Sequence, residues 1–145
     1  MKKFLILFLM SCSVITTLAQ VNQEFMQLQK KANAGNAKAQ CELADCYWYG
    51  EKGVAINYEQ AAIWYSKSAK QNYAPALVAY GMCYIMGKGV PPVAYRAVEE
   101  FTKAAKLGDS DGLYYLAGCY LEGRGVSLDQ KKAFELFQKS ADKGN

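Results

Sequence analysis

Histidine is missing from the 145-residue sequence, and this absence limits the chemistry that the chain can perform. Serine–histidine and cysteine–histidine pairs are excluded, because each needs an imidazole to take the proton of the nucleophile. A zinc site has little support, since the five cysteines include no C-x-x-C spacing and no histidine can complete the ligand set. We therefore expect no histidine-dependent catalysis and no metal or other cofactor.

Runs of basic residues are missing as well. The chain holds 17 basic and 13 acidic residues, and the two kinds alternate along the sequence. A surface that follows nucleic-acid phosphates needs lysines and arginines clustered on one face. We therefore expect no nucleic-acid partner.

Long apolar runs are also scarce. The most apolar stretch, Phe4–Met10, is well short of the ~20 residues that cross a bilayer, so we expect no membrane span. Lys2 and Lys3 precede this stretch, and the small-residue pattern Thr17–Ala19 follows it. This order predicts a signal peptide over residues 1–19, and therefore export to the periplasm, the cell surface or the medium. Acylation at Cys12 is a minor alternative.

One sequence motif, which we call the phrase, recurs in the remaining chain. Tyr84–Val90 and Tyr120–Val126 are two copies of it, and Tyr47–Val54 is a third copy with one residue added between its glycines. The final valines are spaced 36 residues apart both times. A fixed period of this size is typical of stacked supersecondary units.

The residues around the phrase predict pairs of helices. Asparagine or aspartate stands where a helix N-terminus needs a side-chain acceptor, at Asn36, Asn57, Asp109 and Asp129. We predict an all-α fold, an α/α solenoid of three helix-turn-helix repeats with a capping helix over residues 20–35. The repeat domain covers 36–145, in units 36–71, 72–107 and 108–145. The predicted helices are 37–49 and 58–70, 74–86 and 93–107, and 110–122 and 130–143.

Cysteine occupies one column of the repeat, just before the tyrosine of the phrase, at Cys46, Cys83 and Cys119. Equivalent sites in stacked units lie about one helix-packing distance apart, ~8–10 Å. A disulfide needs Cα atoms within about 7 Å. We therefore expect these cysteines, and the additional Cys41, to be free buried thiols.

The third unit carries a family resemblance. Leu116–Val126, followed by Asp129, Ala133, Phe137 and Ala141, resembles the Sel-one-like repeat, a relative of the tetratricopeptide repeats. The resemblance implies an α/α solenoid that serves as an adaptor for other proteins, and an exported bacterial member of the family. A cysteine-rich branch of the family staples each hairpin with paired cysteines, and the spacing here does not fit that pattern.

The binding surface is predicted on the first helix of each unit, which lines the inner, concave face of such an array. Columns not needed for packing change chemical type between units and lie three or four residues apart, so that they form one stripe per helix. We predict binding of a protein or peptide, whose identity stays open, by this set: Lys38, Glu42, Asp45, Trp48, Tyr49, Met82, Met86, Tyr114, Tyr115 and Glu122.

Three alternatives remain open. The aromatic residues of the stripe could pad a tightly closed superhelix instead of binding anything. A glycan or cell-wall fragment could bind at Trp48, Tyr49 and Tyr115. The sequence Ser140–Lys143 spells S-x-x-K, the nucleophile motif of β-lactam-recognising serine hydrolases, but the companion motifs S-D-N and K-T-G are missing. Ser140 also stands in a small-residue column with Ser68 and Ala104, so we expect no catalysis there.

Overall fold

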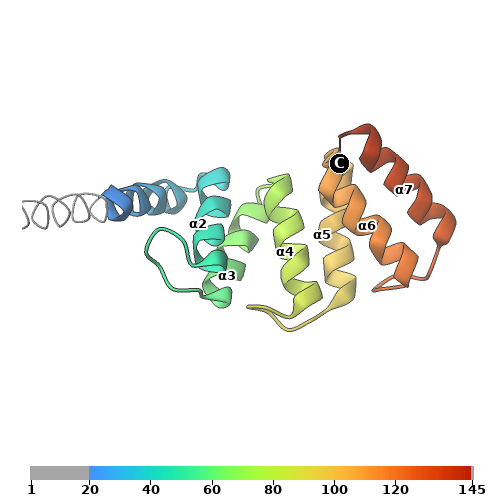
Figure 1. Ribbon diagram of the computed structural model, residues 1–145, viewed down its shortest axis with the longest axis horizontal. Coiled ribbons are helices and arrows are strands. Elements are labelled where there is room, and N and C mark those ends of the chain that lie inside the picture. The colour runs from blue at the N-terminus through green and yellow to red at the C-terminus, as the bar shows by residue number, and fades with distance from the viewer. Residues whose placement is uncertain (1–19, 145) are drawn as a thin grey trace, which may run out of the picture.

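The computed structural model describes residues 20–144, and these residues are helical apart from their connections. The predicted signal peptide, residues 1–19, lies outside the described residues. Residues 20–33 are helical, and Figure 1 shows the helices that follow: α2 (Ala37–Tyr49), α3 (Tyr58–Ala69), α4 (Ala74–Met86), α5 (Ala94–Lys106), α6 (Ser110–Glu122) and α7 (Gln130–Asp142). The predicted solenoid is confirmed, and each predicted helix from 37 onward agrees with the structure to within one residue at either end.

Side-chain caps begin four of these helices as predicted. The Oδ1 atoms of Asn36, Asn57, Asp109 and Asp129 accept hydrogen bonds from backbone N–H groups three residues later, at 2.8–3.0 Å. Each bond satisfies an orphan donor of the first helical turn. Unit two lacks such caps: α4 follows Tyr73 and α5 follows Val93, neither of which caps with its side chain.

The phrase that defines the repeat forms the turn between the two helices of each unit. Gly89 and Gly125, which precede the final valine, both have φ of +74°. The extra residue in unit one leaves Lys52 with φ of +51°, so a non-glycine residue occupies the left-handed region there. In all three units the carbonyl of the phrase tyrosine accepts a backbone N–H from the far side of the turn, at 2.8 to 3.2 Å. The turn is therefore closed by the same hydrogen bond in all three units, although unit one has one more residue in it.

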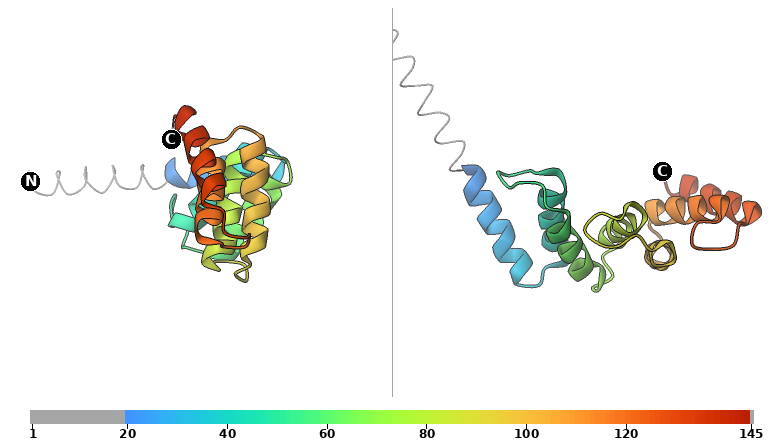
Figure 2. Two further views of the ribbon diagram at one scale, coloured as in Figure 1. Left: turned by 90° about the vertical axis from the view of Figure 1, so that its right-hand side faces the viewer. Right: turned by 90° about the horizontal axis from the view of Figure 1, so that it is seen from below.

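The helix pairs follow one another along the long axis of the molecule (Figure 1), and their axes turn from one pair to the next (Figure 2). The first helices α2, α4 and α6 each pack on the second helix of their own unit, and α4 and α6 also pack on the second helix of the preceding unit. The close approach of α4 to α5 depends on Gly81, where an added Cβ would lie 2.5 Å from Cε1 of the buried Phe101. Residues 20–33 bury Leu28 and Ala32 in the same core, so this segment covers the first unit.

The four cysteines of the described chain, Cys41, Cys46, Cys83 and Cys119, are free and buried, as the column argument predicts. Burial raises the pKa of Cys41 and of Cys83 to about 12. A thiol with so high a pKa stays protonated at neutral pH and is a poor nucleophile. These cysteines therefore act as small apolar core residues.

Candidate functional site

The first helices of units two and three, α4 and α6, lie side by side and border a cavity of about 320 Å³, which we call the α4–α6 groove. Apolar and aromatic side chains form most of its wall. Its lining residues are Met82, Ile85, Phe101, Tyr114, Tyr115, Gly118, Cys119, Leu121, Glu122, Arg124 and Phe137. A concave, mostly apolar surface with a few polar groups is typical of a binding site.

Two tyrosines of α6 form one wall of the groove. The ring of Tyr115 stacks on Phe101 of α5, with centroids 5.4 Å apart and planes inclined by 24°. The ring of Tyr114 meets Tyr115 edge-on at 5.5 Å and Phe137 of α7 at 5.4 Å. Aromatic pairs in such geometries contribute about 0.5–1.5 kcal/mol each beyond their buried area. The wall is thus held by α5 and α7, while Tyr114 stays 49% exposed.

Gly118 opens the groove. A Cβ built on Gly118 would meet no atom within 4 Å, so its missing side chain leaves space rather than relieving a clash. The same column holds Asp45 in α2 and Met82 in α4. The absence of a side chain at Gly118 therefore widens the groove in unit three.

A charged pair lies at the edge of the apolar wall. Arg124 Nη2 is 2.6 Å from Glu122 Oε2, and both side chains are about half exposed, at 50% and 55%. Exposed ion pairs of this kind contribute little to folding, about 0–1 kcal/mol. Glu122 and Arg124 therefore remain available to hydrogen-bond the backbone or side chains of a bound segment.

The structure brings four of the ten predicted site residues together in this groove. They are Met82 of α4 and Tyr114, Tyr115 and Glu122 of α6. Two more, Tyr49 and Met86, end their helices with 64% and 45% exposure and do not line the cavity. Lys38 and Glu42 form an exposed ion pair along α2, with Nζ and Oε1 3.8 Å apart.

The remaining two residues, Trp48 and Asp45, take part in packing within unit one. The Trp48 ring lies edge-on to Tyr58 at 4.9 Å and to Tyr65 at 6.1 Å, both on α3. The Tyr65 hydroxyl donates a 2.6 Å hydrogen bond to Asp45 Oδ1. Burial raises the pKa of Asp45 above its usual value, and the hydrogen bond from Tyr65 opposes part of that rise. Trp48 thus holds α2 against α3, a role that the sequence stripe does not predict.

Repeat-family models match the chain in three consecutive copies. The Sel1 repeat model covers residues 37–73, 74–109 and 110–145, which is most of the sequence. The chain belongs to the Sel1 repeat family. Sel1 repeats generally mediate protein–protein interaction, and Sel1 repeat proteins are typically non-catalytic scaffolds. The resemblance carried by the third unit is thereby confirmed.

Solved Sel1 repeat proteins share the fold. A Sel1 repeat protein from Oxalobacter formigenes is 30% identical, with a TM-score of 0.74 over 85% of this chain and 92% of that one. The protective antigen c5321 of uropathogenic Escherichia coli is 30% identical, with a TM-score of 0.63 over 83% of this chain and 33% of that one. Cysteine rich protein B of Helicobacter pylori is 27% identical, with a TM-score of 0.65 over 83% of this chain and 91% of that one.

A curated relative matches a shorter stretch of the Sel1 repeats. Chitin synthase regulatory factor 3 of Schizosaccharomyces pombe is 31% identical over 75 residues, which is 51% of this chain. The match spans only 8% of that relative's length.

Ser140, the serine of the S-x-x-K sequence, has a structural role in this Sel1 repeat protein. Its side chain is buried, and its hydroxyl donates a 2.8 Å hydrogen bond to the backbone carbonyl of Ser110. Ser68 in unit one does the same to the carbonyl of Ala37, at 2.7 Å. Both bonds join a second helix to the first turn of its own first helix.

Several lining residues of the α4–α6 groove are not among the ten predicted site residues. Phe101, Phe137 and Arg124 line the groove but lie outside the predicted stripe on the first helices. The signal that could have found the groove is Gly118, which stands in a column that holds the larger Asp45 and Met82 in the other two units. Such a loss of volume on an apolar helix predicts a cavity beside the large residues of its neighbours.

Within residues 20–144, no helix is both long and apolar enough to cross a bilayer.

Proposed function

We propose that the chain is a non-catalytic adaptor that binds a segment of another protein in the α4–α6 groove. The observation that carries this proposal is the wall of Tyr114 and Tyr115, which is fixed by Phe101 and Phe137 yet partly open to solvent. A wall ordered before binding lowers the entropy cost of association. Aromatic and methionine side chains are also enriched at protein interfaces.

The groove favours a partner segment with apolar side chains beside polar backbone. Met82, Ile85 and Leu121 offer apolar contacts, and Met82 can adapt its shape to the side chain that enters. The Glu122–Arg124 pair can accept from a backbone N–H and donate to a carbonyl of the segment.

The glycan alternative has less support. Phe101 covers one face of the Tyr115 ring, so a sugar could stack only on the other face. Trp48 packs against Tyr58 and Tyr65 instead of lining the α4–α6 groove, so it does not join Tyr115 in one site.

A pair of matched variants tests the groove. Leu121 lines it and is 46% exposed, whereas Leu128 lies outside it and is 61% exposed. Peptides selected from a random phage-displayed library on the wild-type chain should bind Leu121→Asp at least tenfold more weakly, because a carboxylate would be buried in the apolar wall. The same peptides should bind Leu128→Asp normally. Equal binding to both variants would place recognition elsewhere.

The non-catalytic part of the proposal has its own test. The purified chain should not hydrolyse a chromogenic β-lactam, because the Ser140 hydroxyl is buried and already donates to Ser110. Turnover that disappears in Ser140→Ala would refute this part.

We also propose that the mature chain acts outside the cytoplasm. The support is the sequence of residues 1–19, with its basic start, apolar middle and small-residue end. Mass spectrometry of the chain expressed with its leader in a bacterial host should find Gln20 at the N-terminus. An intact N-terminus at Met1 would contradict export by cleavage.

A further inference from the structure

A second cavity lies between α5 and α7, over α6, and we call it the α5–α7 groove. Its volume is about 590 Å³, and it shares no lining residue with the α4–α6 groove. Its floor and walls combine apolar side chains with charged ones near the rim: Thr102, Ala105, Lys106, Leu113, Leu116, Leu136, Lys139, Asp142 and Lys143.

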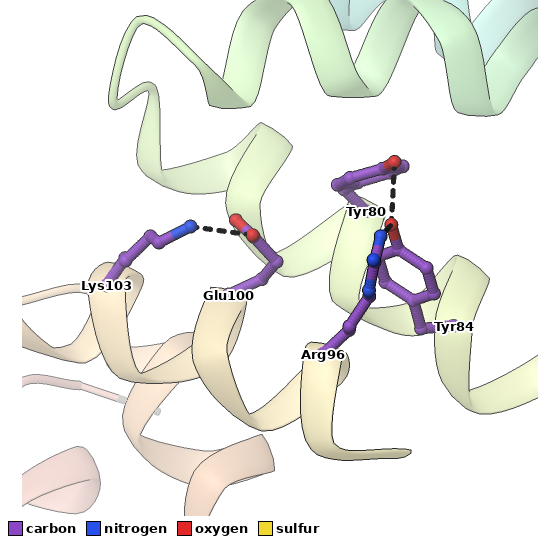
Figure 3. Close-up of polar contacts among 5 residues, drawn as sticks. All are labelled: Tyr80, Tyr84, Arg96, Glu100 and Lys103. Carbon is purple, nitrogen blue, oxygen red and sulfur yellow. Dashed lines mark hydrogen bonds and ion pairs between the residues drawn. The ribbon is translucent and has the colours of Figure 1, made fainter. Parts of the chain in front are cut away.

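The position in unit two that is equivalent to the α5–α7 groove lies between α3 and α5, over α4 (Figure 3). Tyr80 and Glu100 stand there where unit three has Leu116 and Leu136. Figure 3 shows the Tyr80 and Tyr84 hydroxyls hydrogen-bonded at 2.9 Å, and Glu100 paired with Lys103 at 2.7 Å. The Glu100 side chain is only 12% exposed. In unit two this place is therefore a smaller cavity, of about 390 Å³, whose wall carries a polar network of its own.

Unit one fills the same place with an indole. Trp64 stands in the column of Leu136, and it is 8% exposed. The ammonium of Lys67 lies 4.0 Å from the centroid of the Trp64 ring. At the end of α3, Gln71 Nε2 donates to Gln40 Oε1 at 2.8 Å, and Gln40 Nε2 donates to the backbone carbonyl of Ala32 at 3.0 Å. These side chains link the three helices around the place.

Unit three keeps part of the surroundings of that indole but has no indole there. Lys139 stands in the column of Lys67 and Leu116 in the column of Leu43, whereas Leu113 replaces the polar Gln40 of unit one. Leu136 is much smaller than Trp64, and the space between α5 and α7 stays open. An apolar cleft beneath a lysine is a suitable receptor for an aromatic ring, because the ring is desolvated and its face attracts the cation.

The charged residues of the groove indicate which charges the ligand carries beside its aromatic ring. Lys106, Lys139 and Lys143 line the groove together with a single acid, Asp142. None of these three lysines forms an ion pair with another residue of 20–144. Unpaired like charges around an apolar cleft favour a ligand with negative charges beside its apolar part.

We propose that the α5–α7 groove binds a tryptophan side chain presented by an acidic segment of a partner protein. The partner is a different protein rather than a second copy of this chain. The chain has two tryptophans, of which Trp64 is buried and Trp48 packs on Tyr58 and Tyr65. This site lies apart from the α4–α6 groove and does not depend on the function proposed for that groove.

The probe is a capped pentapeptide with two aspartates on each side of a 5-fluorotryptophan. Its ¹⁹F NMR signal reports on the peptide alone, undisturbed by Trp48 and Trp64 of the chain. Addition of the wild-type chain should shift and broaden the signal in a saturable way. Two control peptides test the parts of the ligand: one has alanine in place of the tryptophan, and the other has lysines in place of the aspartates. Each should bind at least tenfold more weakly in competition.

Leu136→Trp is the decisive variant, because it rebuilds in unit three the residue that unit one already holds. It should abolish the saturable ¹⁹F shift while its melting temperature stays equal to the wild type or rises. Phe134→Trp is the matched control, since Phe134 also lies on α7, is 63% exposed and lies outside the groove. It should bind the peptide normally. Lys139→Gln should weaken binding about two- to fivefold through loss of the cation over the ring.

Three results would overturn the proposal: no saturable shift at millimolar peptide, equal binding by Leu136→Trp in its folded state, or equal binding of the lysine-flanked peptide. If Leu136→Trp does not fold, Lys139→Glu provides the test, and unchanged affinity in that variant overturns the proposal. Binding that Leu121→Asp abolishes and Leu136→Trp preserves would place the peptide in the α4–α6 groove. That result would refute this site and support the function proposed above.

Discussion

Gly89 allows a direct test of how the repeats stack. It has φ of +74°, and a Cβ added to it would lie 2.0 Å from the carbonyl oxygen of Tyr58, at the start of the preceding second helix. Gly53 occupies the same column in unit one with φ of +78°, but its nearest neighbour would be Asn22 Oδ1 at 3.6 Å. Alanine at Gly53 therefore meets only the backbone penalty, whereas alanine at Gly89 also separates two repeats.

The two penalties can be estimated separately. An L-residue in the left-handed region costs about 1–2 kcal/mol. Relief of the clash by moving the turn away from α3 should cost a further ~1–3 kcal/mol, as overpacking does in general. Gly53→Ala should therefore destabilise by about 1–2 kcal/mol and Gly89→Ala by about 2–5 kcal/mol. At roughly 3–5 °C per kcal/mol for a domain of this size, Gly89→Ala should melt clearly below Gly53→Ala.

Thermal unfolding followed by circular dichroism at 222 nm, with urea denaturation as a second measure, gives both numbers. The helical signal before melting should be the same in both variants, since neither glycine lies inside a helix. The reasoning is refuted if the Gly53→Ala and Gly89→Ala chains melt within about 2 °C of one another. Equal melting would mean that the turn can leave α3 without cost, and that the close approach at Gly89 does not hold the repeats together.

Three further predictions concern the core. Phe101→Ala should destabilise by about 3–5 kcal/mol in urea denaturation, because it empties a fully buried site beside Gly81; a loss below about 1 kcal/mol would contradict this. Asp45→Asn should raise the melting temperature at pH 7. The raised pKa of Asp45 means that the folded chain disfavours its charged form, so the advantage of asparagine should shrink as the pH falls through that pKa. Destabilisation by Asp45→Asn at pH 7 would mean that the charged hydrogen bond from Tyr65 outweighs burial. The thiols should resist alkylation at pH 8 in the folded chain, because burial raises the pKa of Cys41 to about 12; all four should react after unfolding without reductant, and two missing labels would reveal a disulfide.

The two grooves differ in their lining although the same repeat builds both. The column of Tyr65, Phe101 and Phe137 carries a large aromatic residue in each unit, and Phe101 and Phe137 also line the α4–α6 groove. Other columns that face the grooves change from unit to unit, as from Trp64 to Glu100 to Leu136. A solenoid can accept such changes because each unit contacts only its neighbours, so a change in one groove leaves the others unaltered.

The helices and turns of this protein were predictable from the sequence because local interactions decide them. The caps at Asn36 and Asp109 each need one side chain and a backbone N–H three residues later. The turn at Gly125 needs a residue that accepts positive φ. Repetition at 36 residues then made stacking the only way to bury the apolar faces of the helices.

The site was only partly predictable, because its shape depends on residues that neighbouring helices contribute. The stripe on the first helices placed Trp48 and Tyr115 in equivalent surroundings. The tertiary structure separates them: Tyr58 and Tyr65 cover Trp48, whereas the open space at Gly118 leaves the wall at Tyr115 accessible. Whether a side chain on a helix face packs or binds is decided by the volume that other helices fill around it, and that volume is set only when the repeats stack.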